Sequence, residues 1–98
     1  RRDTIDNPKI IIEVLSKSTE VVDRAEKFLS YQTLESLTEY VLISQEKALV
    51  EQYIRRDDGN WIYQATIGIE SEVVFPSIET GLALSEIYDL VEFEEENL

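Results

Sequence analysis

The 98-residue sequence contains no cysteine, no histidine and no methionine. Without cysteine it can form neither disulfides nor thiolate zinc sites, and it has no cysteine nucleophile. Without histidine it lacks the commonest general base and metal ligand of proteins. Any catalytic chemistry must therefore come from carboxylates, from lysine or arginine, or from hydroxyl groups. The missing methionine and the Arg1-Arg2 start lead us to expect a piece of a longer protein.

Positive charge is also scarce. Nine lysine and arginine residues stand against 21 aspartate and glutamate residues, which gives a formal net charge of −12. The whole excess of negative charge lies after residue 27, because acidic and basic residues balance within residues 1–27. A nucleic-acid-binding protein usually needs a basic surface that contacts phosphates, so this balance argues against such a role. The argument is weakest for residues 1–27.

Long apolar segments are absent, as is a signal-peptide pattern. Runs such as Ile10–Ile12 are far too short to span a bilayer, so we expect no association with a membrane. The absence of cysteine agrees with a reducing compartment, and we expect the protein in the cytoplasm. The length fits a single domain over residues 1–98 with one small core.

The first half of the chain predicts a strand, a helix and a second strand. The β-branched segment Lys9–Leu15 has apolar side chains on both faces, which is typical of a strand buried on two sides. A helix is predicted from Thr19 to Gln32, with its N-cap among Ser16–Thr19. Glu39–Ser44 is predicted as the next strand, and a helix between two strands favours a parallel crossover.

The second half predicts a hairpin and a short helix. Strands are expected over Ala48–Arg55 and Trp61–Ile67, joined by the turn residues Asp57–Asn60. Val73–Phe75 predicts a short strand, and Ser85 is expected to cap a helix that ends near Leu90. The fold class is therefore a mixed α/β sheet. Because one crossover helix covers one face, we expect an open sheet face, which favours a homo-oligomer or cover by a segment outside this sequence.

Glu13 is the residue that does not fit a buried strand. It shares a face with Ile11 and Leu15, while Ile10, Ile12 and Val14 occupy the other face. An ionised carboxylate between two covered faces costs several kcal/mol unless it is paired or bound to a metal. Glu13 is therefore a candidate functional residue. The alternative is that it lies near solvent at a strand end and pairs with a lysine.

Lys27 is a second candidate, although the helical pattern argues against it. An apolar stripe centred on Ala25 places Lys27 on the opposite side of the predicted helix. There Asp23, Lys27 and Tyr31 form a row at a spacing of four residues, which is usually a solvated face with salt bridges. From the helical pattern alone, the solvated interpretation is favoured. The apolar stripe consists of Val21, Val22, Ala25, Phe28 and Leu29.

Three sequence segments resemble a known family. Glu13-Val-Leu-Ser-Lys-Ser-Thr19 is followed by Asp23-Arg-Ala-Glu-Lys27 and then by Glu39-Tyr-Val-Leu-Ile-Ser44. These segments closely resemble the Uma family of restriction-endonuclease-like proteins, which is placed in the PD-(D/E)xK nuclease superfamily. The resemblance implies a restriction-endonuclease-like mixed β-sheet with flanking helices. It also implies that this chain is the C-terminal portion of the domain and that the N-terminal part lies outside it.

The resemblance further implies a metal-dependent endonuclease that hydrolyses DNA. In that superfamily an Asp on one strand and a Glu on the next hold Mg²⁺ or Mn²⁺, and Glu13 would be the second acid. Leu15 occupies the position of the usual lysine, whose role would pass to Lys27 on the helix. The first acid would lie on an upstream strand, so we expect these 98 residues alone to be inactive. The alternative is a catalytically silent, acidic protein-interaction module of the same fold.

Overall fold

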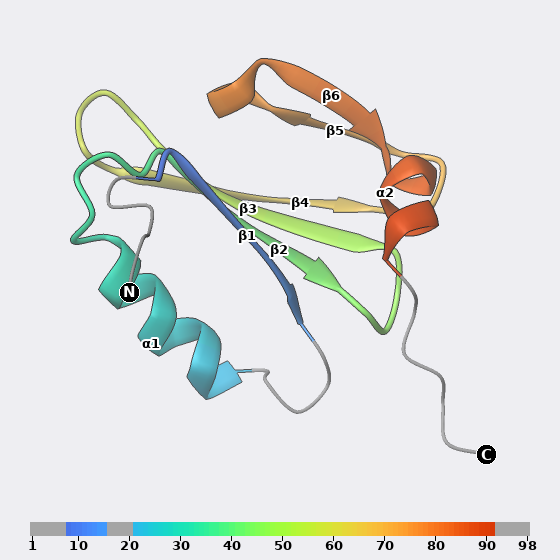
Figure 1. Cartoon of the computed structure of the whole chain (residues 1–98), viewed down its shortest axis with the longest axis horizontal. Helices are drawn as coiled ribbons and strands as arrows, with labels where there is room; N and C mark the ends of the chain where they lie inside the picture. The colour runs from blue at the N-terminus through green and yellow to red at the C-terminus, as the bar shows by residue number, and fades with distance from the viewer. Residues whose placement is uncertain (1–7, 16–20, 92–98) are drawn as a thin grey trace, which may run out of the picture.

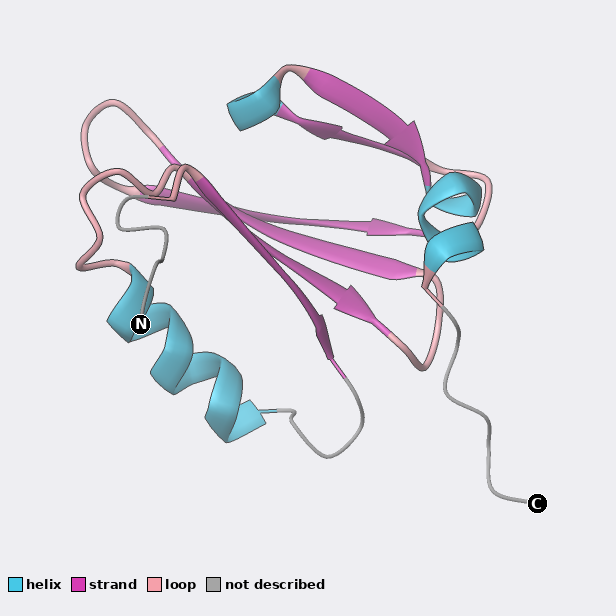
Figure 2. Ribbon diagram, in the orientation of Figure 1, coloured by secondary structure: helices cyan, strands magenta, loops and turns pink. Residues whose placement is uncertain are grey.

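A computed structural model describes residues 8–15 and 21–91 of the chain, and within it the side chains of residues 21–23 are not described. The predicted helix cap at Ser16–Thr19 and the acidic segment 92–98 lie outside the described residues. The elements follow one another as shown in Figures 1 and 2. They are β1 (Ile10–Leu15), α1 (Val21–Tyr31), β2 (Glu39–Ser44), β3 (Leu49–Arg55), β4 (Trp61–Ile67), β5 (Glu72–Phe75), the 3₁₀ helix η2 (Pro76–Ile78), β6 (Thr80–Ala83) and α2 (Leu84–Leu90).

The four longest strands form one mixed sheet in the order β1-β2-β3-β4. β1 and β2 are parallel, and α1 connects them, so the predicted crossover is confirmed. The pairs β2–β3 and β3–β4 are antiparallel. The β3–β4 turn contains Gly59 at φ +90°, a conformation that disfavours side chains, and Asp58 Oδ1 accepts a hydrogen bond from the Asn60 N–H at 3.0 Å. The predicted Asp-Gly turn is thereby confirmed.

Two layers cover the two faces of this sheet (Figure 1). On one face, α1 packs over β1–β3. On the other face, the β5–β6 hairpin and α2 pack against β2 and β3, which corrects the expectation of an open sheet face over these two strands. The cover does not extend fully over β1, where Ile12 and Val14 are 49% and 45% exposed. The main apolar core lies beneath the hairpin and α2 and consists of Val41, Ile43, Val50, Val73, Phe75, Leu84 and Ile87.

The elements at the C-terminal end differ most from the sequence prediction. β6 and η2 were not predicted, and α2 begins at Leu84, with Ala83 rather than Ser85 in the N-cap position. The Glu86 carboxylate accepts a hydrogen bond from the Ala83 N–H at 2.9 Å and so satisfies a donor that has no helical partner. Acidic groups are also favoured in the first turn of a helix, where the helix dipole is positive.

Among residues 8–15 and 21–91, no helix has the length and apolar character that crossing a membrane requires.

Candidate active site

Glu13 lies on β1 and points to the face of the sheet that α1 covers. The parallel register places Glu13 beside Leu42 of β2 and Ile11 beside Tyr40. The Glu13 side chain is 19% exposed, so it is neither fully buried nor freely solvated. The lysine partner of the second interpretation is confirmed, because Glu13 pairs with Lys27. The strand-end position is wrong, because Glu13 lies within β1 and its carboxylate is partly shielded from solvent.

The helix α1 presents a polar and aromatic face to the sheet. Arg24, Lys27, Phe28 and Tyr31 are half-buried, at the spacing of residues that share one helical face. Ala25 is exposed and the side chain of Leu29 is 67% exposed, so the predicted apolar stripe does not define the buried face. The position predicted for Lys27, on the solvated side of the helix, is therefore wrong.

Aromatic packing and two ion pairs explain this orientation of α1. The ring of Phe28 lies 4.2 Å from that of Tyr53 and 5.9 Å from that of Tyr40, measured between centroids. Such aromatic pairs contribute about 0.5–1.5 kcal/mol beyond the burial of their area. The ion pairs join Lys27 to Glu13 and Arg24 to Glu51, one helical turn apart. The sheet thus supplies partners for the charged side of the helix.

Three side chains converge on the carboxylate of Glu13. The Lys27 Nζ lies 3.4 Å from Glu13 Oε1, and the Tyr40 hydroxyl donates to the same oxygen at 3.1 Å. The Tyr31 hydroxyl donates to Glu13 Oε2 at 2.8 Å. The structure therefore brings together the two residues that the sequence nominated, Glu13 and Lys27, and adds two tyrosines.

Both tyrosines are neutral donors near neutral pH. Burial, followed by the hydrogen bond and charge of Glu13, raises the pKa of Tyr31 to about 12. The pKa of Tyr40 is also raised, chiefly by burial and then by the negative charge of Glu13. Both hydroxyls therefore keep their protons and donate hydrogen bonds to the carboxylate.

A second acid lies on the same face of the sheet, two strands away. The register pairs Glu13 with Leu42 and Leu42 with Glu51, so the two acids are in one row across the sheet. Glu51 Oε2 accepts hydrogen bonds from Arg24 Nη2 at 2.8 Å and from the Tyr63 hydroxyl at 2.6 Å. This hydrogen bond and burial raise the pKa of Tyr63 to about 12.

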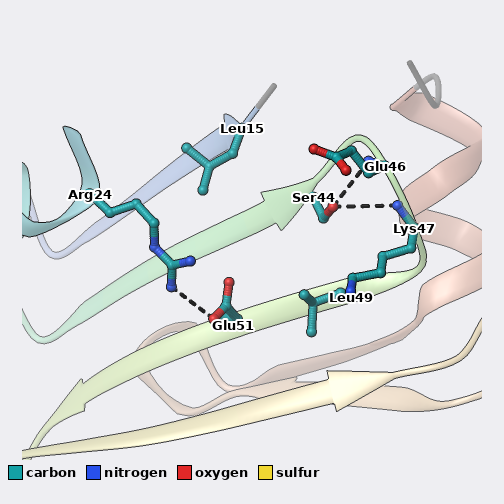
Figure 3. A pocket seen from close by; sticks show the side chains of 7 residues that line it. All are labelled: Leu15, Arg24, Ser44, Glu46, Lys47, Leu49 and Glu51. Carbon is teal, nitrogen blue, oxygen red and sulfur yellow. Dashed lines mark hydrogen bonds and ion pairs between the residues drawn. The ribbon is translucent and has the colours of Figure 1, made fainter. Parts of the chain in front are cut away.

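A pocket of about 450 Å³ opens beside this row, at the carboxyl ends of β1 and β2 (Figure 3). The Arg24 guanidinium and the Glu51 carboxylate form one wall, and the β2–β3 turn forms the other. In that turn the Ser44 hydroxyl accepts hydrogen bonds from the backbone N–H groups of Glu46 and Lys47. Ligands of α/β sheets commonly bind at the carboxyl ends of parallel strands. The residues that line the pocket are Leu15, Arg24, Ser44, Glu46, Lys47, Leu49 and Glu51.

The donor chemistry of Glu13 fits one ligand of a hard divalent cation. A carboxylate oxygen is the ligand that Mg²⁺ prefers, but this ion takes six ligands in nearly octahedral geometry. In the part of the chain that the structure describes, no group of three or more Asp, Glu, His or Cys side chains is placed to hold a metal ion. Further oxygen ligands would have to come from water, from substrate or from residues outside the described part.

The sequence did not single out Tyr40, Arg24 or Glu51, and it placed Tyr31 on a solvated face. One signal was present, because Tyr31 follows Lys27 by four residues and must share its helical face. The contacts of Tyr40 and Glu51 in the site depend on strand register, which the sequence alone does not provide. The hydroxyls of Ser16, Ser18 and Thr19, considered as caps, lie outside the described residues.

Comparison with known proteins identifies the family. The family model described as "Uma2: Putative restriction endonuclease" matches residues 1–86. The chain belongs to this family. The match includes Glu13 and Lys27, and the mixed sheet with two helices agrees with a restriction-endonuclease-like fold.

Two relatives of this Uma2 chain occur in Synechocystis sp.. "Uncharacterized protein slr1290" is 37% identical over 84 residues, which cover 83% of this chain and 42% of that protein. "Uncharacterized protein sll1609" is 38% identical over 71 residues, which cover 72% of this chain and 40% of that protein. The chain thus spans about two fifths of the length of the curated relatives that it matches.

Proposed function

We propose that this chain is the C-terminal part of a divalent-metal-dependent endonuclease domain that hydrolyses phosphodiester bonds in cytoplasmic DNA. The observation that carries the proposal is the contact of 3.4 Å between Lys27 Nζ and Glu13 Oε1. An acid on a strand and a lysine on the following helix are the two groups that the family resemblance leads us to expect together. Membership of the Uma2 family supports nuclease-like chemistry.

In this proposal Glu13 and Lys27 have different roles. Glu13 supplies one oxygen ligand for Mg²⁺ or Mn²⁺, an ion that lowers the pKa of a bound water and stabilises charge on phosphate oxygens. Lys27 places an ammonium group beside Glu13 and offsets the negative charge that develops on the phosphate during hydrolysis. The Lys27 side chain is 43% exposed, so it can reach a phosphate that approaches from solvent.

The proposal is tested with a longer protein that contains this chain and the upstream segment of the family. We expect it to nick supercoiled plasmid DNA with Mn²⁺ and to lose this activity with a chelator. Glu13→Gln should lower the nicking rate by about 100-fold or more, because it removes a ligand charge. Glu70→Gln, a change at an exposed acid elsewhere, is the matched control. Nicking by Glu13→Gln at the rate of the control would refute the assignment.

We also propose that the 98-residue chain alone does not bind Mg²⁺ tightly, because one carboxylate provides too few of the ligands that this ion requires. Isothermal titration calorimetry on the isolated chain should show no tight site. A tight site that disappears in Glu13→Gln would contradict this part of the proposal.

A second candidate is a catalytically silent module that binds other proteins through its acidic surface. The net charge of −12 favours it, since DNA approaches a surface of the same sign unfavourably. This candidate predicts that the longer protein nicks DNA with neither Mg²⁺ nor Mn²⁺, whereas the endonuclease predicts nicking that depends on the metal.

A further inference from the structure

Each oxygen of the Glu13 carboxylate accepts a hydrogen bond from a tyrosine. Tyr31 donates to Oε2 at 2.8 Å, and Tyr40 donates to Oε1 at 3.1 Å. A carboxylate offers about four lone-pair positions in total, so two donors still leave positions for a cation. The tyrosines thus hold the group at both oxygens without saturating it.

The two tyrosine rings are themselves fixed by packing. Tyr40 is fully buried on β2, and its ring meets that of Tyr31 edge to face, with centroids 5.0 Å apart. Phe28 stacks on Tyr40 from the helix. Because a tyrosine side chain turns about only two torsions, rings that are held in this way place their hydroxyl groups at defined points.

Lys27, the third partner of Glu13, is held much less firmly. Its contact with Oε1 is 3.4 Å, which is longer than the 2.7–2.9 Å typical of charge-assisted hydrogen bonds, and its side chain is 43% exposed. An exposed ammonium on a flexible stem can leave the carboxylate at small cost. The tyrosine hydroxyls are therefore held in place beside Glu13, whereas the lysine ammonium can move away and leave room for a cation.

We propose that Tyr31 and Tyr40 are positioning residues that fix the Glu13 carboxylate in the orientation in which it binds a divalent cation. The inference rests on the proposed endonuclease function and adds two residues that act through Glu13. Hydrogen-bonding partners behind a metal ligand typically change metal affinity or activity by about 10–100-fold when they are removed. Neither hydroxyl is required to touch DNA or the metal.

The test measures Mn²⁺ binding directly, in the longer protein, from the electron paramagnetic resonance signal of the free ion. Tyr31→Phe and Tyr40→Phe should each weaken Mn²⁺ binding by about 10-fold, and the double variant should weaken it further. Tyr63→Phe is the matched control, because it removes a tyrosine hydrogen bond to Glu51 instead of Glu13. Thermal unfolding of each variant shows whether it is folded. If Tyr40→Phe does not fold, Mn²⁺ binding by Tyr31→Phe alone tests the inference.

Each outcome separates this inference from the function on which it rests. If both phenylalanine variants bind Mn²⁺ like the unchanged protein while Glu13→Gln does not, the positioning role is wrong and the metal site stands. If Tyr63→Phe weakens binding as much as they do, the effect is not specific to Glu13 and the inference fails. If Glu13→Gln binds Mn²⁺ and nicks DNA normally, the proposed role of Glu13 as a metal ligand fails, and the inference fails with it. If the unchanged longer protein neither binds Mn²⁺ nor nicks DNA, the proposed function itself fails.

Discussion

Glu13 and Glu39 are two carboxylates on neighbouring parallel strands, yet they lie in opposite environments. Glu13 faces α1, is 19% exposed and has an exchangeable lysine among its partners. Glu39 is fully buried, with Gln52 beside it on β3. Gln52 Nε2 donates to Glu39 Oε2 at 2.7 Å, and the Ser77 N–H donates to Oε1 at 3.1 Å.

The difference separates a structural acid from a candidate functional one. The hydrogen bonds of Glu39 connect the sheet to η2, and Gln52 also donates to the Val74 carbonyl of β5 at 2.8 Å. This network anchors the C-terminal hairpin, and its two side chains, those of Glu39 and Gln52, are fully buried. The site around Glu13 has a partly exposed acid beside a lysine that solvent reaches. Accessibility and an exchangeable partner, rather than the presence of a carboxylate, distinguish the functional candidate.

The largest effect on stability is expected where the buried network is broken. Gln52→Ala removes the amide that donates both to Glu39 and to Val74, and it leaves a buried carboxylate with a lost donor. We expect the free energy of unfolding to fall by about 3 kcal/mol, because unsatisfied buried charged groups cost more than neutral ones. Urea unfolding measures the change.

Gln64→Ala is the matched control for this experiment. Gln64 is exposed and donates to Gln52 Oε1 at 3.0 Å, so water can take its place once the side chain is truncated, and its loss should cost less than about 1 kcal/mol. Equal losses for Gln52→Ala and Gln64→Ala would contradict the assignment of the buried network as the anchor.

Alkaline pH is expected to lower the stability of the fold through the tyrosines on the α1 side of the sheet. The pKa values of Tyr31 and Tyr63 are raised to about 12, whereas an unfolded tyrosine titrates near 10. Between these values the unfolded chain releases protons that the folded chain keeps. The free energy of unfolding should therefore fall as the pH rises from about 10 to about 12. Urea unfolding across this interval should show a shallower fall for Tyr31→Phe; an unchanged slope would contradict the coupling of Tyr31 to Glu13.

The smallest effect on stability is expected at the candidate site. Lys27→Met removes one partly exposed ion pair and should change the free energy of unfolding by less than about 1 kcal/mol. Glu13→Gln keeps a side chain that can hydrogen-bond to both tyrosines, so its cost should also remain well below that of Gln52→Ala. Thermal unfolding followed by circular dichroism measures both changes. A loss as large as that of Gln52→Ala would place Glu13 with Glu39 among the structural acids.

Local sequence signals sufficed for much of the sheet. The apolar segment of β2 and the strand after the Asp-Gly turn were predicted with the bounds that the structure has, 39–44 and 61–67. β6 was missed because its four residues include Gly81 and it is stabilised by pairing with β5. A strand this short has too few residues to show an alternating pattern, so its pairing partner rather than its own sequence determines it.

The orientation of α1 could not be predicted from its own residues. The apolar stripe of α1 does not determine which side of the helix faces the sheet. That side is determined by contacts with distant strands, such as Phe28 with Tyr53 and Arg24 with Glu51. Family resemblance nominated Glu13 and Lys27, and the fold brings them into contact. It did not nominate Tyr40, because the position of that hydroxyl depends on strand register and on ring packing.

The most direct test of the central claim is a double-mutant cycle on the Mn²⁺-dependent nicking rate of the longer protein. Residues that act as one catalytic unit lose activity non-additively. We predict that Glu13→Gln and Lys27→Met each lower the rate by about 100-fold and that the double variant is little slower than either. Losses that multiply in the double variant, or single variants that nick DNA at the unchanged rate, would contradict the account.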